Sequence, residues 1–101
     1  MKILVAEDDI DSARLLEIIL KNNEHTVEVV GDGKEALERL RESRFDALLT
    51  DWMMPKMDGV TLIKRVREEV ESAPLILMIT AGGDDESRQK ILQAGADELL
   101  S

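Results

Sequence analysis

The sequence predicts a doubly wound α/β fold in which helices cover both faces of a five-stranded parallel sheet. Short apolar segments alternate along the chain with segments whose apolar residues recur at helical spacing. Each helical segment must return the chain to the same edge of the sheet, which requires parallel strands joined by right-handed crossovers. A length of 101 residues fits one domain, and 44% hydrophobic residues are enough to fill its core. We therefore expect a single domain over residues 1–101.

The first half of the chain is expected to contain three strands and two helices. Residues 3–6 are all apolar and stop at three acids, as a strand buried on both faces does. Residues 10–21 carry an apolar stripe and end at two asparagines, which indicates a helix. Residues 26–30 are mostly β-branched and end in a Gly-Asp-Gly turn, and residues 36–40 return to helical spacing. The apolar segment 45–50 predicts the third strand.

The second half repeats this alternation. Residues 54–59 contain a proline and a glycine and are expected to form a loop, after which residues 60–70 show helical spacing. Residues 75–79 predict the fourth strand, and residues 84–94 predict a helix that ends at a glycine. Residues 99–100 begin the fifth strand. The chain ends there, so we expect one face of the sheet to be incompletely covered.

Charge and composition exclude several classes of function. A formal net charge of -9 repels phosphate backbones and anionic lipid headgroups, so we expect no direct binding to nucleic acid or to membranes. The chain contains no cysteine, which excludes disulfides and thiolate chemistry and suits a reducing compartment. The longest apolar runs are far too short to cross a bilayer. We therefore expect a cytoplasmic protein.

Polar residues follow several of the predicted strands where each strand ends. Glu7, Asp8 and Asp9 follow the first strand, Asp51 follows the third, and Thr80 follows the fourth. Ligands of an open α/β sheet bind beyond the carboxyl ends of the strands, at the point where the strand order reverses. If the strand order is 2-1-3-4-5, the first and third strands lie side by side at this point, so their acids should lie close together.

Clustered carboxylates repel one another unless a proton or a cation compensates them. Two carboxylates, a backbone carbonyl and several waters match the oxygen ligands that Mg²⁺ prefers. The alternative for the acids at 7–9 is helix capping, which places acidic residues before a helix for reasons unrelated to a metal. Asp51 precedes no predicted helix, and this favours the metal-binding interpretation.

The motifs together are similar to the receiver domain of two-component response regulators, of the chemotaxis type, and this resemblance extends over residues 3–101. It implies the flavodoxin-like arrangement of the same α/β sheet, with strand order 2-1-3-4-5. The segments that carry it are Ile3-Leu4-Val5-Ala6-Glu7-Asp8-Asp9, Leu49-Thr50-Asp51-Trp52-Met53-Met54-Pro55-Lys56-Met57-Asp58-Gly59, Ile79-Thr80-Ala81 and Ala94-Gly95-Ala96-Asp97.

The resemblance implies a signalling switch in which Asp51 becomes an aspartyl phosphate. The phosphoryl group would come from a histidine kinase or a phosphotransfer protein, and the chain would not be an enzyme, with self-catalysed phosphotransfer and dephosphorylation left open. The state of the switch would be read by a protein target at the surface of the helix 84–94 and the last strand. Mg²⁺ would be held by Glu7, Asp8, Asp51 and the Met53 carbonyl, and the phosphoryl oxygens by the Thr80 hydroxyl and the Ala81 N–H.

One departure from the family pattern concerns the end of the chain. The family continues after the position of Ser101 with a lysine, a proline and a last helix, and the nearest lysines here, Lys56 and Lys90, do not lie at the matching position. We expect Mg²⁺ binding to survive without that lysine and phosphotransfer to be slower. The uncovered face should favour self-association.

Two other interpretations use the same residues. A receiver-like chain without that lysine can serve as a non-phosphorylated interaction module or be an inactive fragment. A haloacid-dehalogenase-type phosphohydrolase also uses an Asp nucleophile and Mg²⁺, but it requires a second Asp at position 53, where this chain has Met.

Overall fold

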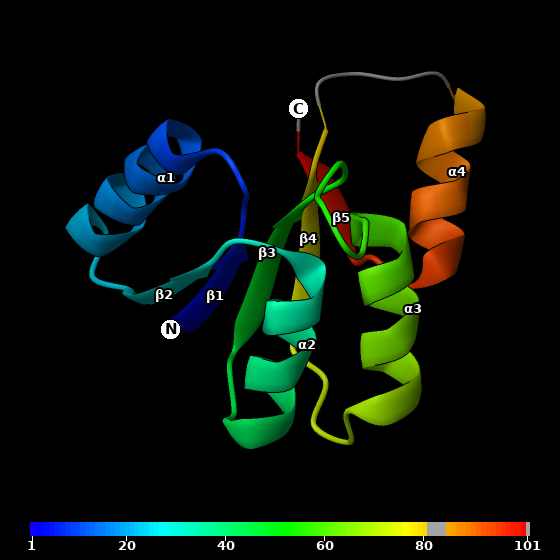
Figure 1. Ribbon diagram of the computed structural model, residues 1–101, viewed down its shortest axis with the longest axis horizontal. Helices are drawn as coiled ribbons and strands as arrows, with labels where there is room; N and C mark the ends of the chain where they lie inside the picture. The colour runs from blue at the N-terminus through cyan, green and yellow to red at the C-terminus, as the bar shows by residue number, and fades with distance from the viewer. Residues whose placement is uncertain (81–84, 101) are drawn as a thin grey trace.

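Five parallel strands form one sheet in the order β2-β1-β3-β4-β5, which confirms the predicted topology (Figure 1). The computed structural model describes residues 1–80 and 85–100. Four helices connect the strands in strict alternation, as right-handed crossovers require. The elements in chain order are β1 (Lys2–Ala6), α1 (Ile10–Asn22), β2 (Thr26–Val30), α2 (Gly33–Glu42), β3 (Ala47–Asp51), α3 (Gly59–Glu69), β4 (Leu75–Ile79), α4 (Asp85–Ala94) and β5 (Glu98–Leu100).

The third strand is shifted from its predicted range of 45–50. It pairs with β1 from Ala47 onward, opposite Ile3, and it continues to Asp51. Asp46 stays outside the strand because its carboxylate accepts the Lys2 N–H at 2.7 Å, while its own N–H donates to the Lys2 carbonyl at 2.8 Å. The side chain of Asp46 thus replaces a backbone partner at the entry to the ladder, an effect that hydrophobic periodicity does not reveal.

Aspartates cap the N-termini of α1, α2 and α3. Asp9, Asp32 and Asp58 have extended backbones and accept a hydrogen bond from the N–H three residues later, at 3.1, 2.8 and 2.8 Å. Such caps satisfy N–H groups that have no partner within the helix, and they place negative charge at the positive end of the helix dipole. The capping interpretation is therefore correct for Asp9.

The two faces of the sheet are covered unequally (Figure 1). Helices α2, α3 and α4 lie on one face and enclose the larger core, which contains Leu4, Leu48 and Ile76. On the other face, α1 packs against β1 and β2 and contributes Leu16 and Leu20 to a smaller cluster. Parallel sheets are normally buried on both faces, so half of this face lacks a cover among the described elements.

Apolar side chains remain exposed along this half-covered face. Leu15 and Ile19 of α1 are 59% and 47% exposed, and Leu75 of β4 and Leu100 of β5 are 46% and 40% exposed. Leu100 pairs with Ile79, which shares the face of Leu75 because side chains alternate along a strand. The expected incomplete coverage is present in the described residues. No helix among them has the length and apolar character needed to span a membrane.

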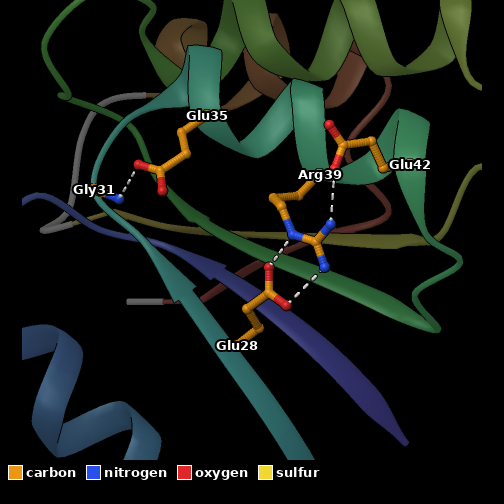
Figure 2. A network of polar contacts seen from close by, with 5 residues as sticks. All are labelled: Glu28, Gly31, Glu35, Arg39 and Glu42. Carbon is orange, nitrogen blue, oxygen red and sulfur yellow. Dashed lines mark hydrogen bonds and ion pairs between the residues drawn. The ribbon is translucent and has the colours of Figure 1, made fainter.

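A polar network ties α2 to the edge strand β2 (Figure 2). The guanidinium of Arg39 donates to both carboxylate oxygens of Glu28, with Nη2 2.9 Å from Oε1, and its Nη1 donates to Glu42 at 3.1 Å. These hydrogen bonds lower the pKa of Glu28 below its ordinary value. Bidentate pairing of this kind fixes orientation as well as distance.

A second network closes the end of α4. Gly95 has a φ of +121°, and its carbonyl accepts from Nε and Nη2 of Arg67 at 2.9 and 2.8 Å. The same guanidinium reaches Oδ2 of Asp97 at 2.8 Å, and that oxygen also accepts the Ile76 N–H at 2.7 Å. The segment between α4 and β5 is thereby bound to α3 and to β4.

We predict that Gly95→Ala destabilises the protein by about 1–3 kcal/mol, because a side chain is strained at this φ. A Cβ there would also lie 2.8 Å from Cγ of Arg67. Urea unfolding measures the loss. The matched control is Gly31→Ala, whose Cβ meets nothing within 4 Å and which should change stability by no more than about 0.5 kcal/mol. Equal stabilities for the two variants would contradict this account.

Candidate functional site

Acidic side chains from two neighbouring strands meet at the carboxyl edge of the sheet. Glu7 and Asp8 follow β1, and Asp51 ends β3, which pairs with β1 along its length. One carboxylate oxygen from each of the three lies within 4.8 Å of the other two. The sheet order reverses between β1 and β3, so the cluster lies where ligands of such sheets bind. The predicted convergence is confirmed for these residues.

The backbone around Asp51 is held by a close approach to the start of α3. The Trp52 N–H donates to Oδ1 of Asp51 at 2.8 Å, and the Gly59 N–H donates to the Trp52 carbonyl at 2.7 Å. A Cβ at Gly59 would lie 2.4 Å from the Asp51 carbonyl oxygen and 2.6 Å from Cε of Met78. Glycine is therefore required at 59 for the start of α3 to pack against the backbone of Asp51.

Glu7 is the member of the cluster whose ionised form is disfavoured by its surroundings. Its Oε2 is buried without a hydrogen-bond partner among the described residues. Burial raises the pKa of Glu7 from 4.5 to about 7, and the hydrogen bond and negative charge of Asp51 add to the rise, followed by Asp8 and Asp9. Two ionised carboxylates are both acceptors, so a proton on Glu7 supplies the donor that this contact lacks.

The donor set fits Mg²⁺. The ion is small, prefers oxygen ligands about 2.0–2.1 Å away in an octahedron and commonly keeps several waters, so carboxylate oxygens a few ångströms apart can share it. A divalent cation would also satisfy the orphan oxygen of Glu7 and compensate the repulsion between the acids. Exposed acids such as Asp8 leave room for coordinated water.

The remaining predicted residues lie around this cluster. Thr80 follows Ile79, the β4 partner of Asp51, and is buried, with its N–H donating to the Leu100 carbonyl at 2.8 Å. Met53 lies two residues beyond Asp51 with its side chain exposed to solvent, and the metal-binding role of its carbonyl stays a prediction. Ala81 lies outside the described residues.

The contact between α2 and the loop of residues 52–58, which joins β3 to α3, was not predicted from the sequence. Lys56 in this loop forms an ion pair with Asp32, with Nζ 3.6 Å from Oδ2, and Gly33 packs against the backbone of Met57. The sequence signals at 32 and 33 are those of an ordinary helix start, so they did not indicate a neighbour distant in the chain. Lys90, the other lysine considered, pairs with Glu86 on α4.

The chain belongs to the response regulator receiver domain family, whose model matches residues 3–101. Members of this family are receiver domains of two-component systems, so the fold and the acidic site belong to a signalling domain. The resemblance expected from the motifs is confirmed.

Relatives include both regulators and kinases. The transcriptional regulatory protein CpxR homolog of Haemophilus influenzae is 39% identical over 99 residues, which are 98% of this chain and 42% of that protein. The autoinducer 2 sensor kinase/phosphatase LuxQ of Vibrio vulnificus is 34% identical over 100 residues, which are 99% of this chain and 12% of that protein. The chain thus spans less than half the length of these curated relatives.

A solved structure similar to this chain contains the expected ion. The receiver domain of a sensor histidine kinase from Pseudomonas aeruginosa was solved with a magnesium ion coordinated in its active-site cleft. It superimposes with a TM-score of 0.90 at 29% identity, covering 99% of this chain and 83% of that one.

We predict that Glu7→Gln removes a pH dependence of stability measured without divalent cations. Because the pKa of Glu7 is raised on folding, the folded chain binds more protons than the unfolded chain between about pH 4.5 and 7. The free energy of unfolding contributed by Glu7 is therefore present below this window and lost as the pH rises through it. The variant should lack this loss, because an amide does not titrate and can donate to Asp51.

Urea unfolding in EDTA at a series of pH values from 4.5 to 8 tests this expectation. Glu98→Gln, which removes an exposed charge on β5, is the control and should keep the parent's profile. Parallel profiles for the parent and Glu7→Gln would show that Glu7 does not titrate differently on folding.

Proposed function

We propose that this chain is a phosphoacceptor switch in which Asp51 takes a phosphoryl group from the phosphohistidine of a histidine kinase or phosphotransfer protein. The observation that carries the proposal is the carboxylate cluster of Glu7, Asp8 and Asp51 at the reversal point of the sheet. Membership of the receiver family and the magnesium-bound neighbour support it. The cytoplasmic location expected from the sequence stays a prediction.

The reaction transfers the phosphoryl group from nitrogen to oxygen. A carboxylate oxygen of Asp51 forms a bond to phosphorus as the bond to the donor's imidazole nitrogen breaks, and that nitrogen keeps the electron pair. The Trp52 N–H holds Oδ1 of Asp51 at 2.8 Å and so fixes the orientation of the attacking group. Mg²⁺ bound by Glu7, Asp8, Asp51 and the Met53 carbonyl would offset the repulsion between the carboxylate and the anionic phosphoryl group.

Thr80 is proposed to transmit the effect of Asp51 phosphorylation to the outer strands of the sheet. Its hydroxyl would hydrogen-bond the phosphoryl oxygens, together with the Ala81 N–H, because Thr80 follows the strand partner of Asp51. Its N–H is bonded to Leu100 of β5, and Leu99 packs against the core beneath α4. A shift at Thr80 would thus alter the α4–β5 surface, where we place the contact with a downstream protein.

The chain is proposed to be the substrate of phosphotransfer, not an enzyme that turns over a separate substrate. A second candidate is an interaction module that is never phosphorylated. It is supported by the charges at the site, since none of the ion pairs found among the described residues supplies a cation to Asp51. Phosphorylation itself separates the two candidates.

We predict that Mg²⁺ followed by beryllofluoride changes the fluorescence of Trp52, the single tryptophan, which is half-buried beside Asp51. Beryllofluoride mimics a phosphoryl group on a carboxylate, so Asp51→Asn should lose the response to it. Acetyl phosphate with mass spectrometry should add one phosphoryl group to the parent and none to the variant. A parent chain silent to both reagents would favour the interaction module.

We also propose that the 101-residue chain self-associates through the half-covered face. Exposed Leu15, Ile19, Leu75 and Leu100 lie on this face, and exposed apolar patches of this kind favour association. A hollow of about 230 Å³ joins the face to the acidic site, and its lining consists of Glu7, Ser12, Leu15, Leu16, Asp51 and Ile79.

We predict a concentration-dependent mass in sedimentation equilibrium and a return to the monomer in the variant Ile19→Glu, which places a charge on the patch. Glu38→Gln on α2, an exposed position on the opposite side of the sheet, is the control and should associate like the parent. A parent chain that stays monomeric up to about millimolar concentration would refute the self-association.

A further inference from the structure

The first turn of α2 lies directly against the loop that follows Asp51. Gly33 is buried, and a Cβ built on it would lie 2.4 Å from the carbonyl oxygen of Met57 and 3.0 Å from Cβ of Met57. Real Cβ atoms do not approach a backbone oxygen this closely, so only glycine permits the contact. Gly31, which precedes α2 by two residues, has open space around the position of an added Cβ.

An ion pair reinforces this contact from the adjacent residues. The two carboxylate oxygens of Asp32 have different partners. Oδ1 accepts the Glu35 N–H at 2.8 Å, and Oδ2 lies 3.6 Å from Nζ of Lys56. The Asp32 side chain is only 14% exposed, so it is a fixed partner for the long lysine side chain. Lys56 itself has a φ of +67°, a conformation that non-glycine residues adopt only when the surroundings hold them there.

The loop is therefore held from both sides. Gly59 fastens one side behind Asp51, and Met57 and Lys56 fasten the other side to α2. Met53 lies between Asp51 and these attachments and offers a backbone carbonyl, which has no rotamers with which to compensate for a displaced loop. Groups that orient metal ligands commonly alter metal affinity about 10–100-fold when they are removed.

We infer that Asp32, Gly33 and Lys56 are positioning residues, which hold the loop so that the Met53 carbonyl faces the acidic cluster. The inference rests on the proposed function, because it assumes that this cluster and Met53 bind Mg²⁺. It assigns to the start of α2 a part in metal and phosphoryl binding, although none of its residues is among the proposed ligands of the ion.

The first test compares Gly33→Ala with Gly31→Ala in titrations of Mg²⁺ followed by Trp52 fluorescence. Gly33→Ala should weaken Mg²⁺ binding about tenfold, because the loop must move to make room for the methyl group, and Gly31→Ala should bind like the parent. Circular dichroism and urea unfolding confirm that each variant is folded at the temperature of the titration. Equal dissociation constants for the two variants would overturn the inference.

A second variant keeps the test decisive if Gly33→Ala does not fold. Lys56→Asn removes the cation and introduces asparagine, a residue that tolerates the left-handed backbone conformation at position 56. Removal of a positive charge from the loop that follows Asp51 should by itself tighten Mg²⁺ binding, whereas a loosened loop should weaken it. The inference predicts binding about two- to threefold weaker at low salt, and unchanged or tighter binding would overturn it.

The two levels of proposal fail in different ways. A parent chain that shows no Mg²⁺ response refutes the proposed metal site, and the inference falls with it. A parent chain that binds Mg²⁺, together with Gly33→Ala and Lys56→Asn variants that bind it equally well, refutes the positioning role alone.

Discussion

Electrostatic repulsion among Glu7, Asp8 and Asp51 is the constraint on which the rest of the structure depends. Three carboxylates within a few ångströms of one another are tolerated only because the adjacent strands β1 and β3 leave them little freedom to separate. Oε2 of Glu7 is buried without a hydrogen-bond partner among the described residues, and burial is unfavourable for an ionised carboxylate. The strands and the loop around Asp51 thus serve to hold charges together, and the stability lost in doing so must come from the hydrophobic core on the α2–α4 face.

Much of this organisation could be predicted from sequence, and the omissions have physical causes. Alternation of apolar segments was enough for a parallel α/β sheet, and the resemblance to the receiver family supplied the strand order. With that order the strand ends were enough to predict the acidic cluster, because the topology brings those ends together. The start of β3 was wrong, because the Asp46 side chain takes a backbone hydrogen bond of Lys2. The contact of Gly33 with Met57 was missed. A glycine at the start of a helix is explained by the turn before the helix, and only the packing of α2 determines that Met57 lies next to it.

The two sides of the sheet are stabilised in different ways. The α2–α4 face combines a continuous apolar core with two polar contacts. Arg39 of α2 binds Glu28 of the preceding strand β2, and Arg67 of α3 binds Asp97, which lies 30 residues further along the chain. The α1 face has a small core, and apolar residues that would ordinarily be covered are exposed. A regulator and a sensor kinase among the relatives each contain a segment similar to this chain. Segments of this kind therefore occur within longer proteins of more than one architecture.

The hydrogen bond from the Thr80 N–H to the Leu100 carbonyl has a consequence for dynamics. Among the described residues it lies at the carboxyl end of the β4–β5 pair, and β5 is only three residues long, so few other hydrogen bonds of this pair resist fraying. An amide in such a place exchanges with solvent whenever the rim opens, without unfolding of the domain. Thr80, which follows β4 and is the proposed contact to the phosphoryl group, therefore lies in one of the least cooperative parts of the sheet, where small energies suffice to redistribute conformers.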